Sequence, residues 1–361
     1  MEPISINPGK RKTGQIFWAG LLVIPPLILL SVNLALAQEM PRELETFLRQ
    51  QIALSDGEMQ DLEQGKVISK VLPSEKEEVA VLGVVRINTP ADFFVDHFRD
   101  IESFKKSTSV PWVKKFSDPP RIEDLAQLEV EQQDFNALKS CRVGSCDVKL
   151  PAEAIERLQK EVDWSAPDAN EQVNRFARAA LLEYVKRYLA GGNAALSEYN
   201  DKKEPLRIAE QFDAILKNSP YIYAFVPQFY EYLRNYPQQH LGNVENFIYW
   251  SKERFGLKPV VSATHVSIYR PAPDLTLITS KQIYASHYFE ASLGLTAAIT
   301  AAHDPTASFY LVYFNRSRSD ALHGGFSGMF RGQIKNRTRT GTQENMEKIK
   351  LSLEGLYHAT G

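Results

Sequence analysis

Two histidines are the residues of this sequence with the clearest chemical potential. His287 falls on the apolar side of the alternating segment 282–299, and His265 belongs to a neighbouring apolar segment. If the two strands pair in a suitable register, the imidazoles meet and could bind a metal ion or act as a general base. The alternative is that each is a hydrogen-bonded histidine without chemistry. We favour that alternative, because no third metal ligand stands near them in the sequence. We therefore name no catalytic residue and expect no metal or cofactor.

The alternating segment also suggests how a ligand could be held. Tyr284, Tyr288 and Glu290 share the polar side and could orient a head group, although a solvated sheet face would show the same pattern. We expect an apolar ligand to contact a set of five residues from these strands: Tyr284, His287, Phe289, Leu293 and His265.

The only two cysteines, Cys141 and Cys146, lie close together in the sequence. In an oxidising compartment such a pair is expected to form a disulfide, and Gly144 between them can supply the tight turn of a small loop. A thioredoxin-like redox pair would have two intervening residues rather than four. A zinc site would need two further soft ligands nearby, and the sequence offers none. We expect a structural disulfide.

The common catalytic and phosphate-binding motifs are missing. The sequence contains no Gly-x-Ser-x-Gly, no His-Glu-x-x-His and no dinucleotide fingerprint. Gly324, Gly325 and Gly328 precede Met329 and Phe330 rather than the Lys-Ser or Lys-Thr of a phosphate loop. The basic stretch 316–339 could meet an anionic membrane surface or a protein partner. A solvated helix face explains the same residues.

Strands that could position these side chains are predicted in five places. The β-branched, apolar run 79–87 is one, and the apolar run 308–314 is typical of a central strand. Segments 247–254 and 259–269 also read as strands. The alternation over 282–299 is long for one strand, so we expect a bulge or a bend within it.

Helices are predicted between and after these strands. One begins at Thr89-Pro90, because proline is favoured in the first turn of a helix. The whole region 152–235 has helical spacing of its apolar residues and forms a helical insertion. A terminal helix follows residue 319, and Gly341 predicts a break in it.

The N-terminal segment 1–37 is predicted to be a signal peptide. Lys10, Arg11 and Lys12 precede the apolar run 16–37, which ends in Ala35-Leu36-Ala37, the small-residue pattern that signal peptidase accepts. The alternative is an uncleaved membrane anchor, since the run is about as long as a spanning helix of roughly 20 residues. Either way we expect export across the membrane, to the periplasm or beyond it. We divide the remainder into an N-terminal helical or linker segment, 38–75, and one domain, 76–361.

Charge argues against one class of partner. The chain has 42 Lys and Arg against 44 Asp and Glu, a formal net charge of −2. Nonspecific nucleic-acid binding depends on a large excess of basic residues that neutralise phosphates. We therefore expect no nucleic-acid partner.

The order of elements resembles the START-like helix-grip superfamily, also called SRPBCC. The strand 79–87 runs into Thr89-Pro90-Ala91-Asp92-Phe93-Phe94, a meander occupies 259–314, and a terminal helix follows from about Ser319. The resemblance implies an α+β fold in which a curved antiparallel sheet grips a long C-terminal helix around a hydrophobic cavity. The insertion 152–235 departs from it. Through Cys-x4-Cys-Asp-Val-Lys-Leu-Pro the chain also resembles uncharacterised exported bacterial proteins, which implies no activity.

These observations lead to one functional expectation and two alternatives. We expect non-enzymatic binding of a hydrophobic small molecule or lipid in the cell envelope. The first alternative is an enzyme that acts on a hydrophobic substrate in the same cavity through His287 and Tyr284. The second is an envelope interaction protein whose helical insertion binds a protein partner.

Overall fold

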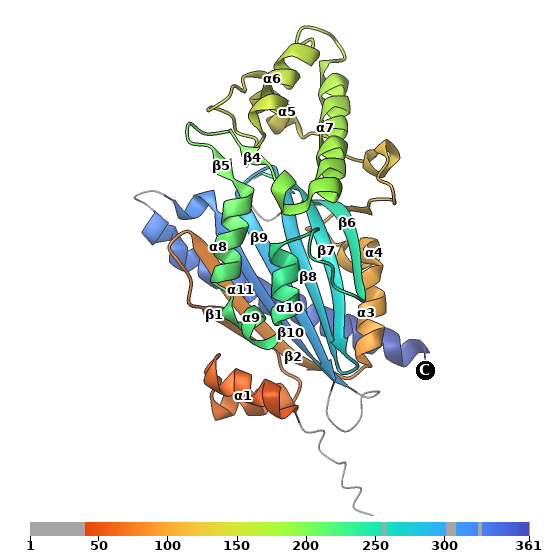
Figure 1. Ribbon diagram of the computed structural model, residues 1–361, viewed down its shortest axis with the longest axis vertical. Helices are drawn as coiled ribbons and strands as arrows, with labels where there is room; N and C mark the ends of the chain where they lie inside the picture. Colours follow the sequence, from red (N-terminus) through yellow and green to blue (C-terminus); the bar gives the residue numbers. More distant parts are fainter. Residues whose placement is uncertain (1–39, 255–257, 301–307, 324–326, 361) are drawn as a thin grey trace, which may run out of the picture. The chain divides into compact units, whose positions relative to one another are not determined.

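A mixed helix-and-strand fold is built on one antiparallel sheet of eight strands, in the order β1-β2-β10-β9-β8-β7-β6-β3 (Figure 1). The computed structural model describes residues 40–254, 258–300, 308–323 and 327–360. The predicted signal peptide, 1–37, lies outside them. The strands of this sheet are β1 (Ile68–Leu72), β2 (Glu78–Ile87), β3 (Trp112–Lys115), β6 (Val244–Glu253), β7 (Val260–Ala272), β8 (Leu275–Ala285), β9 (Phe289–Thr300) and β10 (Phe309–Ser319).

Most of the predicted strands are confirmed. The run 79–87 forms β2, and 308–314 forms most of β10, which lies between β2 and β9 in the interior of the sheet. β10 is apolar on both sides because helices cover both faces of the sheet there. Phe309 contributes to the core on one face and Tyr310 to the core on the other.

The prediction of one long strand over 282–299 is wrong. The segment belongs to two antiparallel strands, β8 and β9, and residues 286–288 join them. Tyr288 adopts a left-handed backbone with φ of 59°, which turns the chain back on itself. The alternation continues through the turn because both arms of the hairpin bury one side. Sequence periodicity alone therefore did not reveal the turn.

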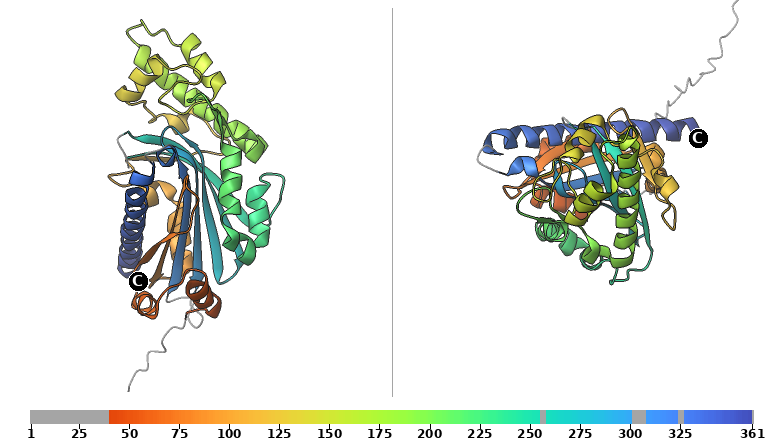
Figure 2. Two further views of the ribbon diagram at one scale, coloured as in Figure 1. Left: turned by 90° about the vertical axis from the view of Figure 1, so that its left-hand side faces the viewer. Right: turned by 90° about the horizontal axis from the view of Figure 1, so that it is seen from above.

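The C-terminal helix α11 (Ser327–Thr360) lies on one face of the sheet with α3 (Ala91–Arg99) and α4 (Ile101–Lys105). Figure 2 shows α11 and the helices α8 to α10 on opposite sides of the sheet. α11 is one helix of 34 residues, so the predicted break at Gly341 is wrong. Met346 and Leu353 are buried against the sheet, and this packing offsets the roughly 1 kcal/mol that a helical glycine costs.

A glycine in β2 allows α11 to approach closely. A Cβ atom on Gly83 would lie 2.1 Å from the Met346 sulfur and 3.0 Å from Thr342 Cγ2. Real Cβ atoms do not make contacts that short, so a side chain at this position would force Met346 and Thr342 to move. Gly83 therefore allows α11 to pack closely on β2.

The opposite face of the sheet carries the largest hydrophobic core. The helices that cover it are α1 (Arg42–Gln50), α2 (Asp56–Glu63), α8 (Ile208–Lys217), α9 (Pro220–Phe225) and α10 (Pro227–Arg234). Phe47 of α1 packs edge-on against Phe314 of β10, with ring centroids 5.9 Å apart. The segment 38–75 thus supplies two helices of this layer. It also supplies β1, which pairs with β2 at the edge of the sheet.

A further group of helices has its own small core. It comprises α5 (Gln132–Lys139), α6 (Ala152–Glu161) and the first part of α7 (Ala169–Gly191). In the chain, η1 (Ile122–Leu125) precedes these helices, and η2 (Gly192–Ala195) and the short hairpin of β4 (Glu198–Tyr199) and β5 (Leu206–Arg207) follow them. α7 connects this core to the sheet, because Val173 lies in the small core while Val185 packs against strands β6 to β8. The described residues cluster as one compact unit, and none of their helices is long and apolar enough to span a membrane.

The predicted disulfide between Cys141 and Cys146 is present in this group. Gly144 adopts φ of 82°, the left-handed conformation that a tight turn requires and that glycine adopts without strain. The loop is anchored from outside, since the backbone N–H of Gly144 donates to the carbonyl of Asn200 at 2.8 Å.

Candidate functional site

An apolar pocket lies between helices α5 to α7 and strands β6 to β8, with a cavity volume of about 130 Å³. Its apolar walls come mainly from α6, α7 and β7, and include Leu158, Val173, Phe176, Ala180, Leu181 and Val261. Tyr284 of β8 and Ser286 of the following turn also line it. The helical group therefore supplies one wall of the pocket and the sheet supplies the other.

Three ion pairs join charged residues that line this pocket. Lys252 Nζ lies 2.9 Å from Glu131 Oε1. Arg157 Nη1 lies 2.8 Å from Glu183 Oε2, and a longer pair joins Arg187 to Glu153 at 3.7 Å. The lining holds five carboxylate residues and three basic residues, so it disfavours an anionic ligand.

Tyr284 reaches the pocket because of a β-bulge. The register between β7 and β8 shifts there, so that Ala263 pairs with Tyr284 while Thr264 pairs with Gln282, and Ile283 is left as the extra residue. Directly paired residues share a face of the sheet, and Ala263 packs against α7. The bulge thus turns Tyr284 to the α7 side. The predicted bulge is present, but the prediction that Tyr284 faces away from Ile283 is wrong.

Two other tyrosines hold the bulge and surround Tyr284. The Tyr184 hydroxyl donates to the carbonyl of Ile283 at 2.6 Å, and the backbone N–H of Ala285 donates to the Tyr199 hydroxyl at 3.0 Å. Their rings lie 6.3 and 6.2 Å from the Tyr284 ring. Burial raises the pKa of the Tyr284 hydroxyl above its ordinary value, so the group stays neutral. Among the described residues it has no hydrogen-bond partner, which leaves it available to a ligand.

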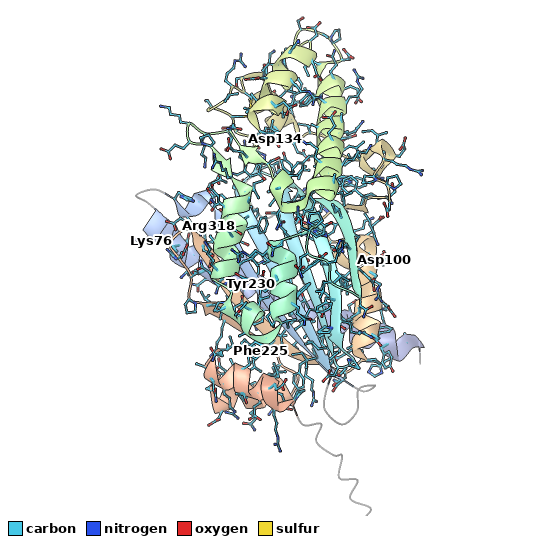
Figure 3. All side chains as sticks on the ribbon, viewed as in Figure 1. Lys76, Asp100, Asp134, Phe225, Tyr230 and Arg318 are labelled. Atoms are coloured by element: carbon cyan, nitrogen blue, oxygen red, sulfur yellow. A yellow bond between two sulfur atoms is a disulfide. The ribbon has the colours of Figure 1, made fainter. Side chains whose placement is uncertain are left out.

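His287 lies in the turn after β8 and is paired with Asp134 of α5. Its Nε2 lies 3.1 and 3.0 Å from the two carboxylate oxygens, and both residues are buried. A carboxylate only accepts hydrogen bonds, so Nε2 carries the proton. Figure 3 labels Asp134 within the group of helices beyond the sheet. The pair ties the β8–β9 turn to α5 and supports the pocket that Asp134 and Ser286 line.

His265 belongs to a different network, on β7. Its Nε2 lies 2.9 Å from Asn246 Oδ1 and its Nδ1 lies 2.9 Å from the Tyr188 hydroxyl. Burial, together with the positive charge of nearby Lys281, lowers the pKa of His265 to about 3. The ring is therefore neutral, donates from Nε2 and accepts the Tyr188 hydroxyl at Nδ1.

The five predicted ligand contacts do not form one site. Tyr284 lines the apolar pocket, and His287 supports it through Asp134. His265 sits in its own network, so the two histidines do not share a partner. Leu293 is buried on β9 and lines a second pocket, and Phe289 begins β9, half-buried.

No cluster of three or more His, Cys, Asp or Glu side chains that could hold a metal ion occurs in the part of the chain that the structure describes. No protein-family model matches this chain, and no curated protein matches it in sequence.

Two residues of these sites were missed in the sequence. Asp134 has no local signal, because its partner His287 is 153 residues away. Lys281 was missed because the residues around it, Thr279, Ser280 and Gln282, are polar, so its burial leaves no mark in the sequence. A buried lysine is rare enough to raise a functional question.

Proposed function

We propose that the protein binds a small, uncharged hydrophobic molecule in the apolar pocket between α5 to α7 and strands β6 to β8. The observation that carries the proposal is the coincidence of apolar walls with the Tyr284 hydroxyl, which has no hydrogen-bond partner among the described residues. Ligand pockets are commonly apolar with a few polar groups that fix orientation.

Size narrows the ligand class. An engineered cavity of about 150 Å³ lined by aliphatic and aromatic side chains holds a benzene molecule. The pocket here, at about 130 Å³, is similar. An aromatic ring or a short alkyl chain fits that space, and the pair of long acyl chains of a phospholipid does not. Of the two expected ligands, a small molecule is therefore favoured over a lipid.

Location outside the cytoplasm is part of the proposal. The predicted signal peptide supports it, and so does the disulfide between Cys141 and Cys146, because disulfides persist in oxidising compartments. Fractionation of cells that express the full chain would locate the protein, and N-terminal sequencing would show whether cleavage follows Ala37.

The binding proposal is tested by filling the pocket. We would titrate the purified protein with indole and follow it by ligand-observed NMR. Ala180 of α7 lines the pocket, so Ala180→Trp should occupy the space and weaken indole binding at least tenfold. Ala190 lies exposed on the same helix and does not line the pocket, so Ala190→Trp is the matched control and should bind as the unchanged protein does.

Two results would count against the proposal. One is an unchanged protein that binds neither indole nor other small aromatic molecules. The other is equal binding by both tryptophan variants, which would place the ligand elsewhere. Native mass spectrometry of gently purified protein gives an independent measurement, because a bound natural ligand would appear as added mass that denaturation removes.

A START-like relationship is a separate proposal, supported by the antiparallel sheet and by the long C-terminal helix packed against β1 and β2. In that superfamily the ligand lies between the sheet and the last helix. No described residue of α11 lines the apolar pocket. A structure with bound ligand would separate the two arrangements, because density beneath α11 would favour the START-like one.

A further inference from the structure

Lys281 is a buried lysine on the middle of the sheet face that α8 and α10 cover. The residue is 5% exposed. Its Nζ donates a short hydrogen bond to Asn193 Oδ1 of η2. It also lies 4.6 Å from the centre of the Phe212 ring and 5.6 Å from that of Tyr188. Among the described residues, no carboxylate lies within ion-pair distance of it.

Other buried lysines of this protein are paired with carboxylates. Lys149 Nζ lies 2.8 Å from Asp320 Oδ1, and Lys252 Nζ lies 2.9 Å from Glu131 Oε1. A buried ammonium without such a partner is costly, and the group responds by losing its proton more easily. Burial lowers the pKa of Lys281 to about 7, and only the charge of Asp213 opposes that effect. Much of the amine is therefore unprotonated near neutral pH.

A pocket opens directly beside this amine. Its cavity volume is about 240 Å³, and it lies between η2, α8, α10 and strands β8 and β9. Figure 1 shows α8 and α10 in front of those strands. Leu196, Leu216, Leu233 and Leu293 make its lining mainly apolar, while Asp213 and Arg234 are exposed residues of the same lining. It shares no lining residue with the pocket of the proposed function.

We propose that Lys281 is a reactive amine that forms a Schiff base with an apolar aldehyde or ketone bound in this pocket. An unprotonated lysine in an apolar site is a nucleophile for carbonyl carbon. The Nζ lone pair attacks that carbon and the carbonyl π electrons move to oxygen, which takes a proton from nitrogen. The carbinolamine then loses its C–O bond and the second Nζ proton, so that a C=N bond and one water molecule form. The step needs no oxidant or reductant.

The site also explains why the ligand should be apolar. The amine lies against the Phe212 and Tyr188 rings, and leucine side chains line the pocket beside it, while the charged residues of the lining, Asp213 and Arg234, are exposed. Asn193 holds Nζ at the pocket wall, and its amide nitrogen is itself fixed by the carbonyl oxygens of Leu233 and Arg234 at 2.9 and 2.8 Å. A straight-chain aldehyde can enter past Asp213 and place its carbonyl carbon against Nζ.

The test traps the imine. Full-length folded protein is incubated with hexanal and cyanoborohydride near pH 7.5, digested and mapped by mass spectrometry. We expect the hexyl adduct on Lys281 to form on the order of 100-fold faster than on an exposed lysine, because far more of the buried amine is unprotonated. Lys281→Met should remove that adduct. The control is Lys217→Met, which removes an exposed lysine of α8 and should leave the Lys281 adduct unchanged.

Two further measurements test whether the pocket and the unprotonated amine cause the fast modification of Lys281. Ala209 lines the pocket, and Ala209→Trp should slow modification of Lys281 without affecting exposed lysines. The rate of modification at Lys281 should reach half its maximum near pH 7. The charged and titratable groups that face Lys281 are Asp213 of α8, Arg234 of α10, Tyr188 of α7 and His265 of β7.

The proposal is overturned if Lys281 stays unmodified in the folded protein while urea-unfolded protein is modified there. Reaction at the rate of exposed lysines would overturn it equally.

Discussion

His265 and Lys281 are direct cross-strand partners on β7 and β8, so their side chains share one face of the sheet. Each is a basic group that is almost completely buried, and the positive charge of Lys281 disfavours a proton on His265. The Tyr188 ring lies against both, 5.5 Å from the imidazole and 5.6 Å from the ammonium nitrogen. The centre of this sheet face thus holds a neutral imidazole and an amine with a pKa of about 7, and their pH dependence gives two predictions.

The first prediction concerns His265 and acid stability. Its pKa is about 3 in the folded protein and about 6.5 in an unfolded chain. Below about pH 6.5 the unfolded chain is protonated at His265 while the folded protein is not. The neutral His265 ring therefore stabilises the fold fully above about pH 6.5, and this stabilisation is lost as the pH falls toward 3. His265→Gln should reduce the acid-dependent loss of unfolding free energy by roughly 1.4 kcal/mol for each pH unit of that interval.

Urea denaturation at several pH values measures this slope. NMR of the His265 ring is a direct check, since its resonances should not move between about pH 5 and pH 8. A ring that titrates near pH 6.5 would show that the residue is not buried as described.

The second prediction concerns the stability cost of Lys281. Its folded pKa of about 7 lies below the unfolded value near 10.4. The cost of burying the charge is therefore fully present below about pH 7 and disappears as the pH rises toward 10.4. Lys281→Met should raise the unfolding free energy by about 1–4 kcal/mol near pH 6, and the gain should shrink by pH 10. Denaturant melts of both proteins at the two pH values test it, and a gain independent of pH would contradict it.

The elements of this fold were predictable where local pattern and tertiary packing agree. β2 and β10 are β-branched or aromatic runs, and burial on both faces preserves that signal. The turn at residues 286–288 was missed because the hairpin continues the alternation across it. The continuity of α11 through Gly341 was missed for a different reason, since packing against β2 overrides the local preference of glycine.

The candidate sites were less predictable than the fold. Tyr284 was identified, but only a one-residue shift between strands places it in the apolar pocket. The partner of His287 comes from α5, far away in sequence, and no periodicity encodes that contact. Lys281 was missed for a similar reason, because its polar neighbours Ser280 and Gln282 give no sign that the fold buries it.

The third prediction concerns the disulfide. Cys141 and Cys146 close a loop with a sequence separation of five residues, and the entropy removed from the unfolded chain by so small a loop corresponds to about 2 kcal/mol. The double variant Cys141→Ala/Cys146→Ala should lose about that much unfolding free energy. Addition of a reductant to the unchanged protein should reproduce the loss. If the reductant lowers stability and the alanine variant does not, a different reductant-sensitive step is responsible.

The last prediction concerns a buried ion pair between Glu78 of β2 and Arg316 of β10. The Glu78 side chain is completely buried, and its second oxygen accepts a hydrogen bond of 3.3 Å from Asn218 Nδ2. Glu78→Gln leaves the buried guanidinium without its counter-charge, which should cost about 3–5 kcal/mol. Urea denaturation measures the loss.

Two variants make that experiment specific. Glu78→Leu/Arg316→Met replaces both charges with apolar side chains and should restore most of the stability, because neither charge is then left buried alone. Glu198 and Arg207 form a pair with a 3.0 Å separation at the surface, where the Arg207 side chain is 66% exposed. Glu198→Gln should cost less than about 1 kcal/mol, since solvent screens an exposed pair.

Equal losses from Glu78→Gln and Glu198→Gln would mean that solvent reaches Glu78. A double variant as unstable as Glu78→Gln would instead assign the loss to packing, because removal of both charges would then bring no recovery.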